Sequence, residues 1–206
     1  PGLRRFLKPL IYIDTKMTIS LVKQAHNAIS SYLLAGDIAV DATMGNGFDT
    51  CFLAKLVGEK GAVYSFDLQQ PALEATRQRL HDNGLFQRVR LIQDNHSQIS
   101  SYLAADHIGL IRCAMFNLGY LPGSDKTIQT EPASTLEALN TLLSLLASPG
   151  MISLIAYTGH QGGQHEADKV KEWAQQLSKK EYRVSIQIPQ AVKQSPPELI
   201  LIESIK

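Results

Sequence analysis

The sequence predicts a doubly wound, Rossmann-like α/β fold, in which helices cover both faces of a mostly parallel sheet of seven strands. Short apolar runs of strand length alternate with longer segments of helical periodicity, as expected for parallel strands joined by crossover helices. The last two strand-like segments follow one another with no helix between them, which indicates an antiparallel pair at the C-terminal edge of the sheet.

The first half of the chain contains three of these strands. Apolar residues recur at helical spacing from Ile19 to Leu33, and Gly36 ends this first helix, which we expect over 18–34. Strands are then expected at 38–42, 62–67 and 89–93, each followed by a helix, at 50–57, 71–83 and 97–104. Pro71 suits a first helical turn, and Gly84 suits a helix end.

The second half of the chain supplies the other four strands. Residues 108–116 are almost all apolar, which is typical of a central parallel strand. Further strands are expected at 151–157, 182–188 and 198–204, with helices at 134–146 and 165–178 and a polar loop at 119–130. No repeat or linker is visible, so we expect one domain over 17–206 and an N-terminal extension over 1–16.

Composition and charge limit the classes of function. No apolar run approaches the roughly 20 residues that cross a bilayer, and no signal peptide is visible, so we expect a cytoplasmic protein without a membrane partner. Cys51 and Cys113 have no metal-type spacing and are expected to be reduced core residues, and we expect no metal site. Residues 1–16 carry a net charge of +3 and the whole chain +1, which leaves −2 for 17–206. Contact with RNA would therefore need a local basic patch.

The segment VDATMGNGFDT, residues 40–50, predicts a cofactor site at the end of the first strand. Ligands of open α/β sheets bind beyond the carboxyl ends of the strands, and Gly45 and Gly47 let the backbone approach a ligand closely. Asp67 ends the second strand, where a carboxylate can accept both hydroxyls of a ribose. The simpler alternative is a tight strand-to-helix turn with no ligand.

The charges in this segment favour S-adenosylmethionine over a dinucleotide. A dinucleotide site needs a third glycine, which is missing, and Asp49 would oppose a pyrophosphate at the helix N-terminus. S-adenosylmethionine has no phosphate and carries a cationic amino group and sulfonium, which suit Asp41 and Asp49.

Polar residues at the ends of the later strands complete the expected site. Asp94, Asn95 or His96 could hydrogen-bond the adenine or its ribose, although such residues are also ordinary in turns. Asn117 can offer its side-chain oxygen to an N–H of an acceptor, and Tyr120 can stack on a flat base. His160, within a glycine-rich segment, could grip a substrate or simply lie in a solvent loop. The other histidines at positions 26, 81, 107 and 165 are interpreted as surface or structural residues.

Five motifs together resemble the class I S-adenosylmethionine-dependent methyltransferases, and within them a bacterial family long labelled as rRNA methylases. The motifs are DATMGNGFDT, FDLQ, NLGYLPG, YTGHQGG followed by Glu166, and SPPEL, within 17–206. This family is similar to enzymes that methylate the wobble uridine of tRNA. The chain departs from the expected patterns at Thr43, often glycine in methyltransferases, at Phe48, where a histidine is expected, and in NLGY, which replaces Asn-Pro-Pro-Tyr.

The resemblance implies a reaction, a partner and a set of site residues. The reaction is methylation of the amine of 5-aminomethyl-2-thiouridine, and the partner is tRNA through its anticodon stem-loop; a homodimer is compatible with the sequence. Alternatives are an rRNA or small-amine methyltransferase and a nucleotide-binding module without turnover. The expected catalytic residues are Asn117, Tyr120 and His160. The expected cofactor-binding residues are Asp41, Gly45, Asn46, Gly47, Asp49, Thr50, Asp67, Gln69, Asp94, Asn95 and His96.

Overall fold

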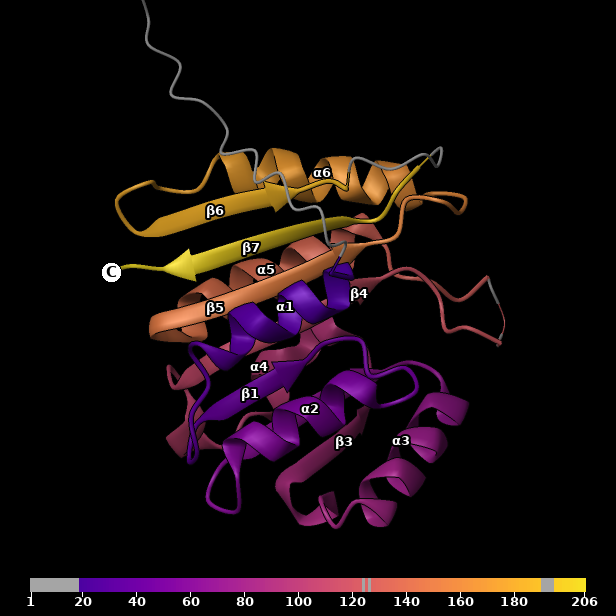
Figure 1. The fold of residues 1–206 in the computed structure, drawn as a ribbon, viewed down its shortest axis with the longest axis vertical. Helices are drawn as coiled ribbons and strands as arrows, with labels where there is room; N and C mark the ends of the chain where they lie inside the picture. Colours follow the sequence, from indigo (N-terminus) through magenta and orange to yellow (C-terminus); the bar gives the residue numbers. More distant parts are fainter. Residues whose placement is uncertain (1–18, 124, 126, 190–194) are drawn as a thin grey trace, which may run out of the picture.

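A seven-stranded sheet organises the structure, a computed structural model that describes residues 19–123, 125, 127–189 and 195–206 (Figure 1). The strand order is β3-β2-β1-β4-β5-β7-β6. The strands are β1 (Ile38–Asp41), β2 (Ala62–Asp67), β3 (Val89–Gln93), β4 (Ile111–Leu118), β5 (Leu146–Ala156), β6 (Tyr182–Gln187) and β7 (Glu198–Ser204). The first five strands pair in parallel, and β7 runs antiparallel to both β5 and β6. The doubly wound sheet and its antiparallel edge are therefore confirmed.

Helices cover both faces of the sheet (Figure 1). Their bounds are α1 (Leu21–Ser30), α2 (Phe48–Val57), α3 (Gln70–Asp82), α4 (Ile99–Tyr102), α5 (Pro132–Leu145) and α6 (Gly163–Gln175). Apolar side chains of α1, α2 and α3 pack on one face, and those of α4, α5 and α6 pack on the other. The chain therefore builds one hydrophobic core on each side of the sheet.

The central strand β4 shows why these strands have almost continuous apolar sequences. Ala114 and Phe116 point into one core, whereas Cys113 and Met115 point into the other. Full burial of side chains as large as those of Phe116 and Met115 contributes about 1.5–3 kcal/mol each. Cys113 is a buried free thiol, as is Cys51, and burial raises the pKa of the Cys113 thiol.

Several element boundaries differ from the predicted ones. β4 begins at Ile111 rather than 108, because Ile108 and Leu110 are 58% and 54% exposed and precede the sheet. α1 is shorter than the predicted helix, and β5 begins five residues earlier than predicted. The predicted extension 1–16 lies outside the described residues. Within the described part of the chain, no helix is long and apolar enough to span a bilayer.

Candidate functional site

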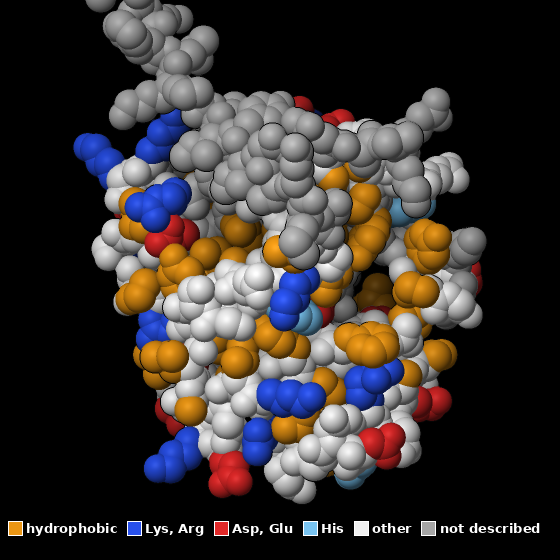
Figure 2. Space-filling model, in the orientation of Figure 1, with side chains coloured by type: hydrophobic (Ala, Val, Ile, Leu, Met, Phe, Trp, Pro, Cys, Tyr) orange, Lys and Arg blue, Asp and Glu red, His pale blue; other side chains and the backbone are white. Residues whose placement is uncertain are grey.

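A cavity of about 1250 Å³ opens where the carboxyl ends of the five parallel strands meet. Loops that follow β1, β2, β3, β4 and β5 contribute to its wall. Figure 2 shows the surface of the molecule hollowed on this side, with hydrophobic side chains around the opening. The position is the one at which ligands bind in doubly wound folds.

The turn after β1 is held in a conformation that needs glycine. Gly47 has a φ of +78°, and a Cβ there would lie 2.6 Å from Oγ1 of Thr76 on α3. The Gly45 N–H donates to Oδ2 of Asp67 at 2.9 Å, and Thr76 Oγ1 donates to the Gly45 carbonyl at 3.1 Å. Contacts from β2 and α3 therefore fix the turn before any ligand arrives.

Asp67 faces the cavity from the end of β2. Its other oxygen, Oδ1, accepts the Gln69 N–H at 2.9 Å, so each oxygen has one backbone donor and a further acceptor position. Burial raises the pKa of this carboxyl, and the backbone N–H groups of Gln69, Gly45 and Leu68 act against that rise. The carboxylate can thus accept two hydroxyls in addition to its backbone bonds.

Three residues of the expected cofactor set do not line the cavity: Asp41, Gly47 and Thr50. Asp41 is completely buried below the turn, where Oδ2 accepts from Thr50 Oγ1 at 2.6 Å and Oδ1 from the Thr43 N–H at 3.2 Å. Burial, together with the nearby negative charge of Asp49, raises the pKa of Asp41 to about 7. Asp41 and Thr50 therefore support the turn from beneath, whereas Gly47 is part of the turn itself.

The Asp49 carboxylate joins two further elements at the cavity floor. Oδ2 accepts from Nδ2 of Asn117 at 2.6 Å, and Oδ1 lies 2.6 Å from Nε2 of His26 on α1. The Asn117 backbone N–H donates to Oγ1 of Thr43 at 2.7 Å. Because its amide nitrogen is bound to Asp49, Asn117 is left with its side-chain oxygen as an acceptor.

His26, interpreted as a surface or structural residue, has a partner at the site that the sequence did not indicate. Its contact with Asp49 spans 23 positions of the chain and joins α1 to α2, so no local motif contains it. One signal was available: His26 lies on the helix face that also carries Val22, which lines the cavity, and Ile29, which is buried.

The loop after β4 is anchored from α6. The Gly119 N–H donates to Oγ1 of Thr130 at 2.8 Å, and this hydroxyl donates to Oε2 of Glu166 at 2.6 Å. The hydroxyl of Thr135 donates to the other oxygen of Glu166 at 2.7 Å. Glu166 is buried, so these bonds fix both ends of the loop against the body of the protein.

Tyr120 and His160 lie together on the side of the cavity that the loops after β4 and β5 form. Their ring centroids are 5.4 Å apart and the rings are nearly perpendicular. Nδ1 of His160 lies 3.1 Å from Oε1 of Gln129, whereas Nε2 is buried against Gly119, where a Cβ would approach it to 3.3 Å. His160 therefore supports the loop around Tyr120 by packing.

Asp94, Asn95 and His96 line the cavity from the loop after β3, as their position in the sequence indicated. Asp94 accepts from the Tyr102 hydroxyl at 2.7 Å, and Asn95 accepts from the Ser97 N–H at 2.9 Å. Nδ1 of His96 lies 3.0 Å from the Ala42 carbonyl, and Nε2 is buried without a hydrogen-bond partner among the described residues. Burial lowers the pKa of His96 to about 4, so the ring is neutral at pH 7 and Nε2 is an acceptor.

These features define the class I S-adenosylmethionine-dependent methyltransferases: a doubly wound sheet ending in an antiparallel strand pair, a glycine turn after β1 and a carboxylate at the end of β2. Residues 63–203 match the family described as "Putative rRNA methylase", and the chain belongs to this family. The described residues contain no cluster of three or more His, Cys, Asp or Glu that could hold a metal ion.

Three relatives show the extent of the similarity. The chain is 36% identical over 162 residues to the chloroplastic tRNA (mnm(5)s(2)U34)-methyltransferase of Arabidopsis thaliana. The aligned segment covers 74% of this chain and 58% of that protein. A crystal structure of a protein described as an rRNA-methylase, from Clostridium thermocellum, matches this fold with a TM-score of 0.86. The two chains are 39% identical, and the match covers 92% of this chain and 100% of that one. A methyltransferase of Streptococcus mutans in complex with SAH has a TM-score of 0.82 and 36% identity, with the same coverage of both chains.

The buried carboxyl of Asp41 predicts a pH dependence of stability. Its pKa is raised in the folded chain, from 3.8 to about 7, so its stabilising contribution is full below pH 4 and is lost as pH rises through 7. The free energy of unfolding should therefore fall by up to about 1.4 kcal/mol per pH unit between pH 5 and 7. This component should be missing in Asp41→Asn.

Urea unfolding at pH 5, 6 and 7 gives the free energy of unfolding of both proteins. The component due to Asp41 is the difference between the slopes of these free energies against pH. His96 acts in the opposite direction, because its depressed pKa removes stability as pH falls, but it is common to both proteins and cancels. Parallel pH profiles for the parent protein and the variant would show that Asp41 does not titrate in this range.

Proposed function

We propose that the protein transfers the methyl group of S-adenosylmethionine to the primary amine of 5-aminomethyl-2-thiouridine at the wobble position of tRNA. One observation carries the proposal: Asp49 fixes the Asn117 amide so that its oxygen is left as an acceptor at the end of β4. An acceptor oxygen suits an amine, which presents N–H groups. The similarity to the Arabidopsis tRNA methyltransferase supports the choice of nucleoside.

The loops after β1, β2 and β3 form one side of the cavity, which we call the donor side and which fits S-adenosylmethionine. Asp67 is placed to accept the ribose hydroxyls, and the buried acceptor Nε2 of His96 suits a donor such as the adenine amino group. The turn at Gly45 and Asn46 and the nearby Gln69 would hold the rest of the molecule. When bound, the cofactor supplies an electrophilic methyl group on a sulfonium.

The end of β4 and the loops after β4 and β5 form the other side, the acceptor side, which orients the amine. The carbonyl of Leu118 already accepts the Tyr157 N–H, and that of Gly119 accepts the Thr130 N–H, so Asn117 is the principal acceptor at this strand end. With one N–H held by Asn117, the nitrogen lone pair can be directed at the methyl carbon, and Tyr120 can pack on the uracil ring. Such orientation contributes up to about 7–11 kcal/mol to lowering a barrier.

The competing candidate is an rRNA base, because the family description names rRNA. The protein lacks the strong positive charge of a general RNA-binding protein, with −2 over residues 17–206, and this balance does not separate the two RNA classes. The substrate itself must therefore be tested.

Methyl transfer to purified RNA distinguishes these substrates. The protein with labelled S-adenosylmethionine should label tRNA whose wobble uridine carries the aminomethyl group, and mass spectrometry of the digested tRNA should find 5-methylaminomethyl-2-thiouridine. Matched controls are the same tRNA without the aminomethyl group, total rRNA and the free modified nucleoside. Label in rRNA or in the free nucleoside alone would contradict the proposal.

Asp67→Asn should weaken binding of S-adenosylmethionine by roughly 10- to 100-fold, because the loss of a charged hydrogen bond costs about 1.5–3 kcal/mol. Calorimetry measures the dissociation constant, and NAD should not bind either protein. Glu74→Gln, an exposed change on α3, is the control and should bind like the parent. An unchanged dissociation constant for Asp67→Asn would place the ribose elsewhere.

Asn117→Ala should lower kcat/KM for methyl transfer by on the order of 100-fold while changing the dissociation constant of S-adenosylmethionine little. The reason is that Asn117 orients the acceptor rather than the cofactor, so its loss removes transition-state stabilisation. Asn140→Ala, on the exposed side of α5, is the control. Turnover of Asn117→Ala at the parent rate would show that other groups hold the amine.

A further inference from the structure

We propose that Asp49 and His26 form a proton exit that takes the excess proton of the acceptor ammonium from the cavity to solvent. The proposal rests on the proposed function, in which the acceptor is a primary amine. It assigns a catalytic role to Asp49 and a proton-carrying role to His26.

An amine acceptor makes a proton acceptor necessary. Alkyl amines resemble the lysine side chain, whose pKa is about 10.4, so the substrate reaches the protein mainly as an ammonium without a lone pair. The ammonium must first lose one proton. The freed lone pair then forms a bond to the methyl carbon, the electrons of the carbon–sulfur bond return to sulfur, and the products are a thioether and a methylated ammonium. One proton has left the substrate for the protein.

Asp49 is a carboxylate of the cavity wall in a position to take this proton. It lines the cavity, and the same carboxylate binds the Asn117 amide that is proposed to hold the amine. Asp41 lies beneath the turn and outside the cavity wall, and Asp67 lies at the end of β2, away from Asn117, where it is proposed to bind the ribose. Of these three carboxylates, Asp49 alone joins the acceptor side.

His26 connects this carboxylate to the outside. Its Nε2 lies 2.6 Å from Oδ1 of Asp49, and its ring stacks on Phe52 with centroids 3.8 Å apart and planes 4° apart. The stack holds the ring in place, and 21% of the side chain remains exposed. The imidazole can therefore receive a proton on the Asp49 side and release one from its other nitrogen.

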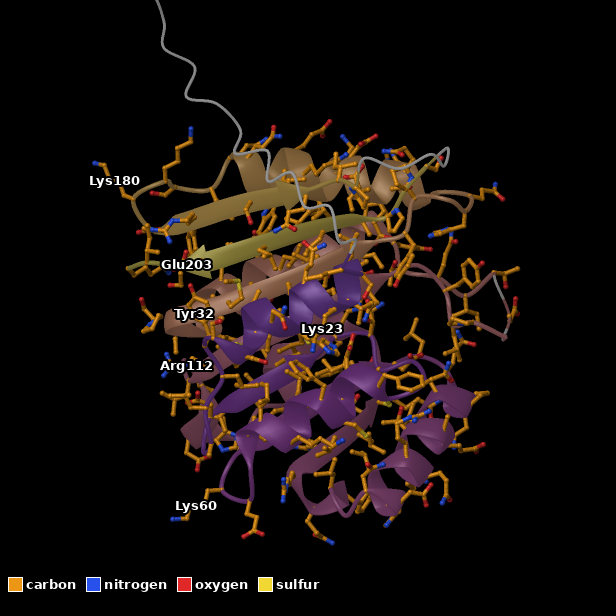
Figure 3. All side chains as sticks on the ribbon, in the orientation of Figure 1. Lys23, Tyr32, Lys60, Arg112, Lys180 and Glu203 are labelled. Atoms are coloured by element: carbon orange, nitrogen blue, oxygen red, sulfur yellow. The ribbon has the colours of Figure 1, made fainter. Side chains whose placement is uncertain are left out.

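The charged and titratable groups around the pair come from three elements. Asp41, at the end of β1, and Tyr157, after β5, both interact electrostatically with Asp49. On α1, Lys23 lies one turn before His26 and is exposed (Figure 3).

A purely structural role would give different behaviour from a proton-carrying role. If His26 only fixes the carboxylate that holds Asn117, then a glutamine, which can donate one hydrogen bond to Asp49, should replace it well. A glutamine cannot carry a proton. The two roles therefore separate in the pH dependence of the rate and not in the folded structure.

The test measures single-turnover methyl transfer to the aminomethyl tRNA between pH 6 and 9.5 for the parent protein, His26→Gln and His26→Ala. At pH 7 His26→Gln should be slower by on the order of 100-fold, the scale of general acid–base catalysis. The deficit should shrink as pH rises, because more amine arrives already neutral. Added imidazole should restore part of the rate of His26→Ala. Binding of S-adenosylmethionine should stay within about threefold of the parent value in both variants.

His81→Gln, an exposed change on α3, is the control and should follow the parent pH profile. The proton exit would be overturned if His26→Gln were as fast as the parent at pH 7. It would also be overturned if the deficit of His26→Gln were constant with pH and imidazole did not raise the rate of His26→Ala. A parent protein that does not methylate this amine at any pH would remove the proposed function, and the proton exit with it.

Discussion

The Asp49 carboxylate is the constraint on which the site depends. It lies in the first turn of α2, where the helix dipole favours a negative charge, and it binds His26 of α1 and Asn117 of β4 at the same time. One side chain thus ties two helices and the central strand together at the cavity floor. The same negative charge occupies the position that a pyrophosphate would need, so the structural link also selects the class of cofactor.

In addition to this shared link, each side of the cavity has its own supports. On the donor side, Asp67 and Thr76 hold the glycine turn from β2 and α3. On the acceptor side, the buried Glu166 holds the loop after β4 through Thr130. Methyl transfer needs the donor and the acceptor in line. The supports of both sides come from elements of one sheet and the helices packed on it.

The sequence predicted the bounds of some strands well and those of others poorly. The strands at 62–67 and 89–93 have the predicted bounds, whereas β4 starts late because Ile108 and Leu110 are apolar but exposed. Within the site, the glycine turn and Asp67 follow from local motifs. His26 could not be found in this way, because its partner comes from another helix and only the packing of α1 against α2 brings the two together.

Three aspartates of the same cavity region show why residue type alone does not assign a role. Asp41 is enclosed, and its carboxyl has a pKa raised to about 7. Asp67 faces the cavity and is supported by two backbone N–H groups, which leave acceptor positions for a ligand. Asp49 is shared between an imidazole and an amide. The sequence grouped all three as cofactor residues because each ends or follows a strand, but depth and partners separate a buried support, a ribose acceptor and a group at the reacting end. A role for a carboxylate is therefore a property of its surroundings, and in this fold those surroundings are supplied by elements distant in the chain.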